Sequence, residues 1–243
     1  MLLLVDADIS AYQAATRSEV EIRWDEDTWT IHSDFTKAKE HFDYLLESYK
    51  KATQVDEFKL CFSGSNNYRK VLNPTYKGNR KGRKPVGYSG LKEWAMETYP
   101  SMCKDSIEAD DCMGILATKH PGKTIIVSMD KDMLTIPGKM YHTSPGGSGE
   151  FKNTTEEEAN YRFLTQAMTG DATDGYAGIP GVGPKKAEEL LKKHGVVWKT
   201  VLDAYLKAGL TYEDALVNAR MARILRDVDW NFDKEEVKLW TPN

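Results

Sequence analysis

The chain alternates short apolar runs with amphipathic stretches, and this alternation limits its fold more than any other feature. Apolar runs of strand length lie at residues 1–5, 58–62 and 124–127, with a weaker one at 140–143. Such runs are typical of strands buried on both faces of a parallel sheet. Stripes at helical spacing lie between them, as over residues 35–52. The sequence therefore predicts an α/β domain with a parallel sheet covered by helices.

A change of pattern near residue 170 divides the chain. Helical patterns then dominate, over 184–194, 197–207 and 211–226, and no convincing strand occurs before residues 236–239. We therefore expect a core domain over residues 1–169 and a helical lobe over 170–243. Within the core, apolar residues alternate on both sides of the turn at 25–28, which predicts a β-hairpin.

Composition excludes several classes of protein. Hydrophobic residues make up 40% of the chain and charged residues 29%, which fits neither a disordered nor a membrane protein. The net charge of −4 argues against a protein that coats DNA by bulk charge. The apolar run at residues 1–5 is too short for a signal peptide. Cys61, Cys103 and Cys112 form no CxxC pair, so we expect a reducing cytosol and no disulfides.

Acidic residues occur in four clusters, two of them directly after apolar runs. The clusters are Asp6, then Glu108 with Asp110 and Asp111, then Asp130 with Asp132, and last Asp171 with Asp174. Any one cluster has an ordinary explanation as a helix N-terminus or a turn. The carboxyl ends of parallel strands meet at one edge of a sheet, however, so the clusters are expected to converge there.

Converging carboxylates need compensation, because two of them about 4 Å apart repel by roughly 1–4 kcal/mol. Protonation or a hard cation with oxygen ligands would supply it. The five histidines show no metal-binding spacing, so Mg²⁺ or Mn²⁺ fits best. Two carboxylate-held metal ions a few ångströms apart are a known apparatus for phosphodiester hydrolysis.

A basic segment lies within residues 64–90, which we call the arch. Between residues 69 and 84 there is no acidic residue, and Tyr68, Tyr76 and Tyr88 lie in or beside this run. The seven basic residues are Arg69, Lys70, Lys77, Arg80, Lys81, Arg83 and Lys84. The pattern suits a phosphate backbone with base stacking, so we expect a long, mobile, DNA-binding loop. A merely solvated surface loop is the alternative.

The glycine-rich stretch at 178–186 is the most specific in the chain. Gly181 and Gly183 permit close approach and positive φ, and Pro184 suits the first turn of a helix. The free amides at that helix start would face a phosphate, beside Lys185 and Lys186. This pattern predicts a helix-hairpin-helix that grips a nucleic acid backbone regardless of sequence.

Segments that carry a family resemblance occur in order along nearly the whole chain. They read LLLVDAD at 2–8, NYRK at 67–70, YKGNRKGRKPVGY at 76–88, EADD at 108–111, IIVSMDKDMLTIP at 125–137, GDATDGYAGIPGVG at 170–183 and MARILR at 221–226. Together they resemble the 5′-nuclease superfamily, which includes flap endonucleases and the 5′→3′ exonuclease domain of bacterial DNA polymerase I. The chain is most similar to the exonucleases of short-tailed, T7-like phages.

The resemblance implies a parallel-sheet, PIN-like 5′-nuclease core, an arch loop and a C-terminal helix-hairpin-helix lobe. It implies that two Mg²⁺ ions, or Mn²⁺, are held by Asp6, Glu108, Asp110, Asp111, Asp130, Asp132, Asp171 and Asp174. Lys77 and Arg80 would contact the scissile phosphodiester and Tyr76 would stack near the strand end. The other predicted DNA contacts are Arg69, Lys70, Lys81, Arg83, Lys84, Gly181, Gly183, Lys185 and Lys186, with a K⁺ ion at the hairpin.

The resemblance also implies a function: a monomeric 5′→3′ exonuclease on duplex DNA, also active on RNA–DNA hybrids, in phage replication or recombination in the host cytoplasm. One departure is Gly64, at a position where the family usually has an Asp. Asp8 could compensate for it. A flap endonuclease, a non-catalytic DNA-end-binding protein and a smaller PIN-type ribonuclease are the alternatives.

Overall fold

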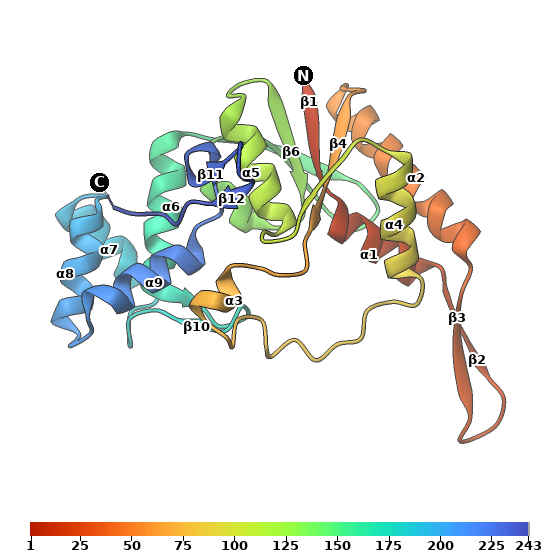
Figure 1. The fold of residues 1–243 in the computed structure, drawn as a ribbon, viewed down its shortest axis with the longest axis horizontal. Helices are drawn as coiled ribbons and strands as arrows, with labels where there is room; N and C mark the ends of the chain where they lie inside the picture. The colour runs from red at the N-terminus through yellow and green to blue at the C-terminus, as the bar shows by residue number, and fades with distance from the viewer. Residues whose placement is uncertain (243) are drawn as a thin grey trace.

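The computed structural model describes residues 1–242 and is built on one six-stranded sheet (Figure 1). The strand order is β5-β4-β1-β6-β7-β8, and only β8 runs antiparallel to its neighbour. The bounds are β1 Leu2–Asp6, β4 Phe58–Ser63, β5 Ser101–Lys104, β6 Thr124–Ser128, β7 Gly138–Thr143 and β8 Gly149–Thr154. The predicted α/β class and its parallel strands are confirmed.

Helices cover both faces of this sheet because side chains of a strand alternate between faces. Leu3 and Val5 pack with α1 (Ala7–Arg17), α2 (Phe35–Thr53) and α4 (Tyr88–Thr98). Leu4 points the other way and packs with α5 (Ala109–Lys119) and with the C-terminal residues Leu225 and Trp230. Strands buried on both sides explain why the apolar runs of the sequence are nearly continuous.

A third apolar core lies among α6 (Glu156–Thr169), α7 (Pro184–His194), α8 (Trp198–Lys207) and α9 (Tyr212–Ala222), on the left of Figure 1. Four residues of α6 belong to this core: Phe163, Leu164, Ala167 and Met168. The packing therefore crosses residue 170, and a division of the chain there remains a prediction. The remaining short elements are α3 Arg69–Leu72, η1 Lys131–Thr135, β9 Gly170–Asp171, β10 Tyr176–Ala177, η2 Asp227–Asp229, β11 Trp230–Asn231 and β12 Glu236–Val237.

The structure differs from the sequence prediction at β5, at β8 and at the end of α9, and it adds the short elements α3, β9, β10 and β11. β5 and β8 were missed, because β5 has only four residues and β8 is a mostly exposed edge strand with few apolar side chains. α9 ends at Ala222 instead of 226. The next residues leave the helix and pack against α5, where the Leu225 amide donates to the Asp111 carboxylate at 3.0 Å.

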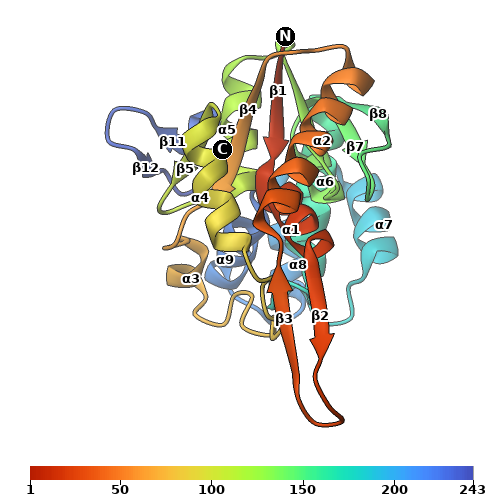
Figure 2. The ribbon, with the colours of Figure 1, turned by 90° about the vertical axis from the view of Figure 1, so that its right-hand side faces the viewer.

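The predicted hairpin consists of β2 (Glu19–Arg23) and β3 (Trp29–Ser33), which pair in antiparallel register. Figures 1 and 2 show it projecting away from the sheet and the helices. The arch runs from α3 to α4 as a long, mostly irregular segment on the same side of the molecule. Among residues 1–242, no helix has the length and apolarity that crossing a membrane requires.

Candidate active site

Six of the eight predicted acidic residues line one cavity of about 240 Å³ beyond the carboxyl ends of the strands. They are Glu108, Asp110, Asp130, Asp132, Asp171 and Asp174. Lys77 and Arg80 of the arch line the same cavity. Residues up to 97 positions apart in sequence therefore meet in one place, as the order of apolar runs and acids predicts.

Hydrogen bonds from nearby groups orient three of these acids. The Asp130 carboxylate caps η1 by accepting from the Asp132 amide at 2.8 Å. Asp132 in turn accepts from the Gln166 side chain at 3.0 Å. Asp171 accepts from the amides of Thr173 and Asp174, at 2.7 and 3.2 Å, in the turn between β9 and β10. These bonds hold the carboxylates at the cavity wall.

Glu108 stands at the start of α5 and has three cationic or polar partners. It accepts from Lys77 Nζ at 2.5 Å, from Tyr76 Oη at 2.8 Å and from Arg69 at 3.3 Å. Burial alone would raise the pKa of Glu108, but the positive charges of Arg69 and Lys77 outweigh it and lower this pKa to about 2. Glu108 is therefore ionised throughout the neutral range.

Asp6 and Asp110 lie deeper among the acids. Burial, followed by the charges of Asp6, Asp130 and Glu108, raises the pKa of Asp110 well above its ordinary value. Asp6 does not line the cavity, and its carboxylate accepts from Ser128 Oγ at 2.8 Å and from the Ile9 amide at 3.2 Å. Burial raises the pKa of Asp6 to about 7. Both shifts come first from burial of the carboxyl group and second from the neighbouring acids.

Arg69 and Asp111 require a correction, because they form a buried ion pair with each other. Arg69 donates to both Asp111 oxygens at 2.7 and 2.8 Å, and also to the carbonyls of Met221 and Arg223. The Asp111 side chain is fully buried and that of Arg69 is 3% exposed. In this arrangement Asp111 is not a metal ligand and Arg69 is not a DNA contact: the pair joins the arch, α5 and the chain after α9.

Tyr76 also requires a correction. Tyr76 is only 3% exposed. Its hydroxyl donates to the Glu108 carboxylate at 2.8 Å and also lies 3.2 Å from the Asp174 carboxylate, to which it can donate as well. A ring buried in this way has no free face for a DNA base. Tyr76 instead orients the carboxylates of Glu108 and Asp174 through these two hydrogen bonds.

Lys77 and Arg80 reach into the cavity from the arch. Lys77 has φ of +55°, an unusual value for a side-chain-bearing residue, and its amide donates to the Asp174 carbonyl at 2.9 Å. Arg80 donates to the Asp174 carboxylate at 2.6 Å. Strained backbone is common at functional sites, where the surroundings enforce it. The two cations neutralise part of the acidic charge in this arrangement.

The donor set of the cavity suits a hard cation. All six acids offer oxygen, the ligand that Mg²⁺ and Mn²⁺ prefer, and no histidine or cysteine lines the cavity. As the side chains stand, however, no three His, Cys, Asp or Glu residues within 1–242 converge closely enough to hold one ion. The acids fit divalent metals in chemistry and number, and Lys77 and Arg80 would have to yield their contacts.

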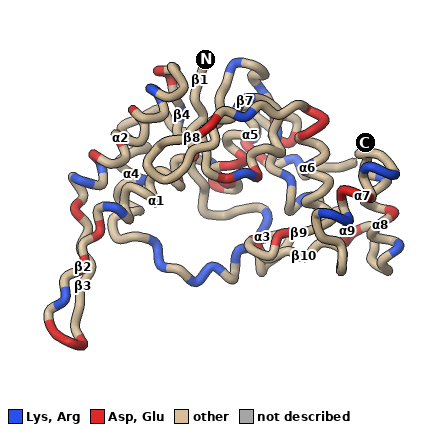
Figure 3. The backbone as a smooth tube through the Cα atoms, turned by 180° about the vertical axis from the view of Figure 1, so that it is seen from behind, with Lys and Arg blue, Asp and Glu red and all other residues tan. Residues whose placement is uncertain are grey.

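The other predicted arch residues are exposed. Lys70, Lys81, Arg83 and Lys84 all reach solvent, and Figure 3 shows the basic residues strung along the arch. Arg83 pairs with Glu19 of the hairpin through two bonds of 2.7 and 3.0 Å. Lys84 Nζ lies 4.7 Å from the centre of the Tyr88 ring.

The glycine-rich stretch begins α7, as predicted. Gly181 has φ of +72° and Pro184 is the first residue of the helix. Gly183 has φ of −89°, so of the two glycines only Gly181 uses the positive φ that glycine permits. Lys185 and Lys186 are exposed beside the helix start. Their binding to DNA remains a prediction.

Gly64 has a packing explanation. A Cβ atom at this position would lie 2.1 Å from the Lys104 carbonyl oxygen and 2.5 Å from the Asp105 Cα. No side chain fits there, so this backbone cannot present a carboxylate at residue 64. The neighbouring Asp8 accepts from the Ser63 amide and from Tyr88 Oη, both at 2.8 Å, and faces a separate hollow under the arch.

Sequence reasoning missed three residues of the site. Ser128 supports Asp6, Gln166 supports Asp132, and the buried Tyr176 lines the cavity. Ser128 ends an apolar run directly before the acids and could have been noticed there. Gln166 and Tyr176 carry no comparable signal, since their roles depend on how α6 and β10 pack.

Comparison with known proteins identifies the class. The family model described as 5′-3′ exonuclease, N-terminal resolvase-like domain, matches residues 1–163. The chain belongs to the 5′-3′ exonuclease family. The predicted membership in the 5′-nuclease superfamily is thereby confirmed, and the chain is a nuclease hydrolase.

Particular relatives come from phages. The exonuclease of Escherichia phage T7 is 33% identical, with 99% of this chain and 93% of that protein aligned. The exodeoxyribonuclease of Enterobacteria phage T3 is 32% identical over the same shares. The D15 protein of phage T5, solved with metal ions, matches with a TM-score of 0.65 at 14% identity, over 92% of this chain and 89% of that one. A T5 D15 flap endonuclease complex with DNA and metal ions gives 0.63 at 14% identity over the same shares, so the fold is shared.

Proposed function

We propose that this chain is a metal-dependent 5′→3′ exodeoxyribonuclease that hydrolyses phosphodiesters of duplex DNA to 5′-phosphorylated products. The observation that carries the proposal is the cavity of six acids with Lys77 and Arg80 reaching into it from the arch. The acids supply oxygen ligands for two Mg²⁺ or Mn²⁺ ions, and the cations lie where a phosphate would neutralise them. The metal-bound structures of the T5 protein support this reading.

Each group then has a chemical task. When bound, two divalent ions activate a water and stabilise the leaving oxygen. The acids that would hold these ions are Glu108 and Asp110, at the start of α5, and the four other acids of the cavity, Asp130, Asp132, Asp171 and Asp174. Lys77 and Arg80 release Glu108 and Asp174 and bind the non-bridging oxygens of the scissile phosphate. Asp6, which is buried next to the cavity without lining it, would add to the negative potential that attracts the metal ions.

The lobe would hold the duplex. The amides at the start of α7 and the exposed Lys185 and Lys186 suit a phosphate backbone without base readout. We further propose that backbone carbonyls of residues 178–186 bind a K⁺ ion. We also propose that the enzyme acts on RNA–DNA hybrids and that it serves phage DNA replication or recombination in the infected cell. The phage origin of the T7 and T3 relatives supports this last assignment.

A time course with duplexes labelled at the 5′ or the 3′ end tests the proposal. In Mg²⁺, the 5′ label should leave as mononucleotides, while the 3′-labelled strand shortens progressively. Binding without hydrolysis in both Mg²⁺ and Mn²⁺ would refute it in favour of a DNA-end-binding protein.

A flap endonuclease is the second candidate, favoured by the flap endonuclease named in the T5 complex. The same assay on a 5′-labelled flap separates the two. Release of the intact flap oligonucleotide favours flap cleavage, and mononucleotides favour the exonuclease.

Replacing Lys77 with alanine should slow single-turnover cleavage by roughly 10²–10³-fold, because one cation on the scissile phosphate is lost. DNA affinity should change much less, since the exposed arch cations remain. Rapid-quench kinetics and fluorescence anisotropy measure the two effects. A variant that binds poorly but cleaves bound DNA at the normal rate would show that Lys77 only binds.

Replacing Gly181 with valine should weaken duplex binding by roughly tenfold on every sequence. Its φ of +72° disfavours any side chain, although no atom lies within 4 Å of a Cβ there. Gly209 has φ of +78° with equally open space, outside 178–186, so Gly209→Val is the matched control. Anisotropy on several duplexes measures the effect. An equal loss in both variants, or a loss on some sequences only, would contradict the assigned backbone grip.

A further inference from the structure

Asp8 is an acid near the active site that the proposed mechanism leaves without a role. It is the second residue of α1 and lines the hollow of about 860 Å³ under the arch, apart from the six acids of the cavity. A carboxylate beside a path for phosphates repels them unless donors compensate its charge. The structure shows which donors these are, and they come from both ends of the arch.

The two oxygens of the Asp8 carboxylate bind different ends of the arch. One oxygen accepts from the Ser63 amide at 2.8 Å, at the point where β4 ends and the arch begins. The other accepts from Tyr88 Oη at 2.8 Å, at the point where the arch passes into α4. The Tyr88 residue is only 6% exposed. One side chain of the core therefore joins two ends of a long loop that are far apart in sequence.

Lys92 completes this connection. It lies one turn after Tyr88 on α4, and its Nζ donates to the Ser63 carbonyl at 2.6 Å and lies 3.7 Å from the Asp8 carboxylate. Residues four apart share a helix face, so Tyr88 and Lys92 meet Asp8 and Ser63 together. We call these four residues the arch junction. The side chains of Asp8 and Lys92 are 22% and 20% exposed, so their opposite charges compensate each other with little access of solvent.

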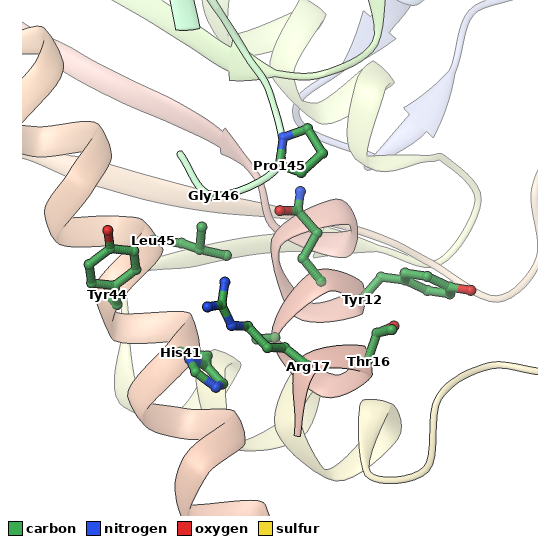
Figure 4. A pocket seen from close by; sticks show the side chains of 10 residues that line it. Tyr12, Thr16, Arg17, His41, Tyr44, Leu45, Pro145 and Gly146 are labelled. Carbon is green, nitrogen blue, oxygen red and sulfur yellow. The ribbon is translucent and has the colours of Figure 1, made fainter. Parts of the chain in front are cut away.

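The start of α4 depends on groups from α1. Gly87, the residue before α4, has φ of +85° and offers no capping side chain, and the first turn of α4 contains no acid. A negative charge near the start of a helix is favourable, and Asp8 supplies one through its bond to Tyr88. Tyr12, one turn after Asp8, packs edge-on against the Tyr88 ring, with 6.5 Å between the ring centres. Figure 4 shows the Tyr12 side chain on the side of α1 that faces away from α2.

The arch junction also reaches the acids of the cavity. The Ser63 hydroxyl accepts from the Ala109 amide at 3.0 Å. Ala109 lies between Glu108 and Asp110 at the start of α5, and both of these acids line the cavity. The bond from Ser63 to Asp8 therefore holds a residue that itself fixes the start of α5.

The junction matters most once the arch cations leave their acids. Without metal, Lys77 and Arg80 hold the arch to Glu108 and Asp174. Divalent ions on these two acids would replace both contacts. The arch would then depend on its other end, where the junction holds it together with the bonds of Arg83 to the hairpin.

We propose that Asp8 is a positioning residue that joins the two ends of the arch and so places Lys77 and Arg80 over the cavity. This inference rests on the proposed function, because the two cations act only on a bound phosphate. It gives Asp8 a role other than that of a metal ligand compensating for Gly64. Both Asp8 oxygens are bonded to donors of the arch ends, and the residue does not line the cavity of acids.

Hydrogen–deuterium exchange tests the junction without any nuclease activity. In Mg²⁺ and without DNA, Asp8→Ala should speed exchange by roughly tenfold in peptides that cover residues 61–68 and 84–92, because both ends lose a bond to a charged acceptor. Asp43→Ala is the matched control. Asp43 accepts from Tyr99 Oη at 2.6 Å beyond the other end of α4, so its loss should leave both peptides unchanged.

Single-turnover kinetics test the role of Asp8 in cleavage. Asp8→Ala should cleave bound DNA roughly 10–100-fold more slowly, because misplaced groups lose their geometry at the phosphate, while duplex affinity changes far less. Asp8→Asn should recover most of the rate, since its oxygen can accept from Ser63 and its amide can donate to Tyr88 Oη. Tyr88→Phe should give a smaller loss, and adding it to Asp8→Ala should slow cleavage no further.

The possible failures are distinguishable. Unchanged exchange at both ends of the arch in Asp8→Ala overturns the proposal whether or not the chain cleaves DNA. Asp8→Ala that needs more Mg²⁺ but keeps wild-type exchange identifies Asp8 as a metal ligand and overturns it as well. A loss of duplex affinity with a normal rate on bound DNA would make Asp8 a residue of the binding surface instead. If the wild-type chain binds DNA without hydrolysis, the proposed function fails, and the positioning role fails with it even where exchange shows the junction.

Discussion

Replacing Asp110 with asparagine should reduce cleavage by on the order of 10³-fold or more while making the metal-free protein more stable. In the unfolded chain this carboxyl ionises at its ordinary pKa, whereas burial and the nearby acids raise its pKa in the folded chain. At neutral pH the folded state therefore carries a charge, or takes up a proton, at a cost that the unfolded state does not have. Asparagine removes that cost and at the same time removes one of the proposed metal ligands.

Thermal unfolding with and without Mg²⁺ and a nuclease assay measure the two effects. We expect a higher melting temperature than wild type without metal, and a smaller rise on adding Mg²⁺, because a ligand that binds only the folded state stabilises it. Asp203→Asn is the matched control, an exposed carboxylate on α8 paired with Lys199. A stable variant with the full Mg²⁺ effect and normal cleavage would remove Asp110 from the site.

The position of the site could be predicted because it depends on strand order alone. Asp6 ends β1 and Asp130 comes two residues after β6, and these strands are parallel neighbours, so both residues lie at the same edge of the sheet. The arch was also recognisable, since a run of cations with no acid is visible without any structure. Both inferences use local pattern and one rule of sheet topology.

The division of labour among neighbouring residues could not be predicted. Asp110 and Asp111 are adjacent on α5 and chemically equal, but successive helical residues point about 100° apart. Asp110 therefore faces the cavity and Asp111 faces the core. Likewise Arg69 has the same charge as Lys70, and only the packing of α3 against the chain after α9 buries one of them. Such choices depend on tertiary contacts that leave no periodic signal.

The buried ion pair between Arg69 and Asp111 leads to a second prediction with a large expected effect, on the stability of the protein. Replacing Arg69 with alanine should destabilise the protein by about 3–5 kcal/mol, because it leaves Asp111 as an uncompensated buried charge. Two backbone carbonyls, of Met221 and Arg223, also lose their donor. Urea unfolding measures the loss. Lys70→Ala is the matched control, since Lys70 is the exposed neighbour in the same short helix.

The outcome separates two roles for Arg69 that the sequence could not. If Arg69 contacted DNA, its alanine variant would keep wild-type stability and lose duplex affinity, which would contradict the buried pair. If the pair is what matters, replacing both members with apolar residues, Arg69→Met with Asp111→Leu, should recover part of the stability that Arg69→Ala loses. Cleavage should remain impaired in that double variant, because Glu108 has lost one of the donors that hold it at the cavity. Recovery of stability without recovery of cleavage would therefore show that Arg69 both stabilises the fold and positions an acid of the site.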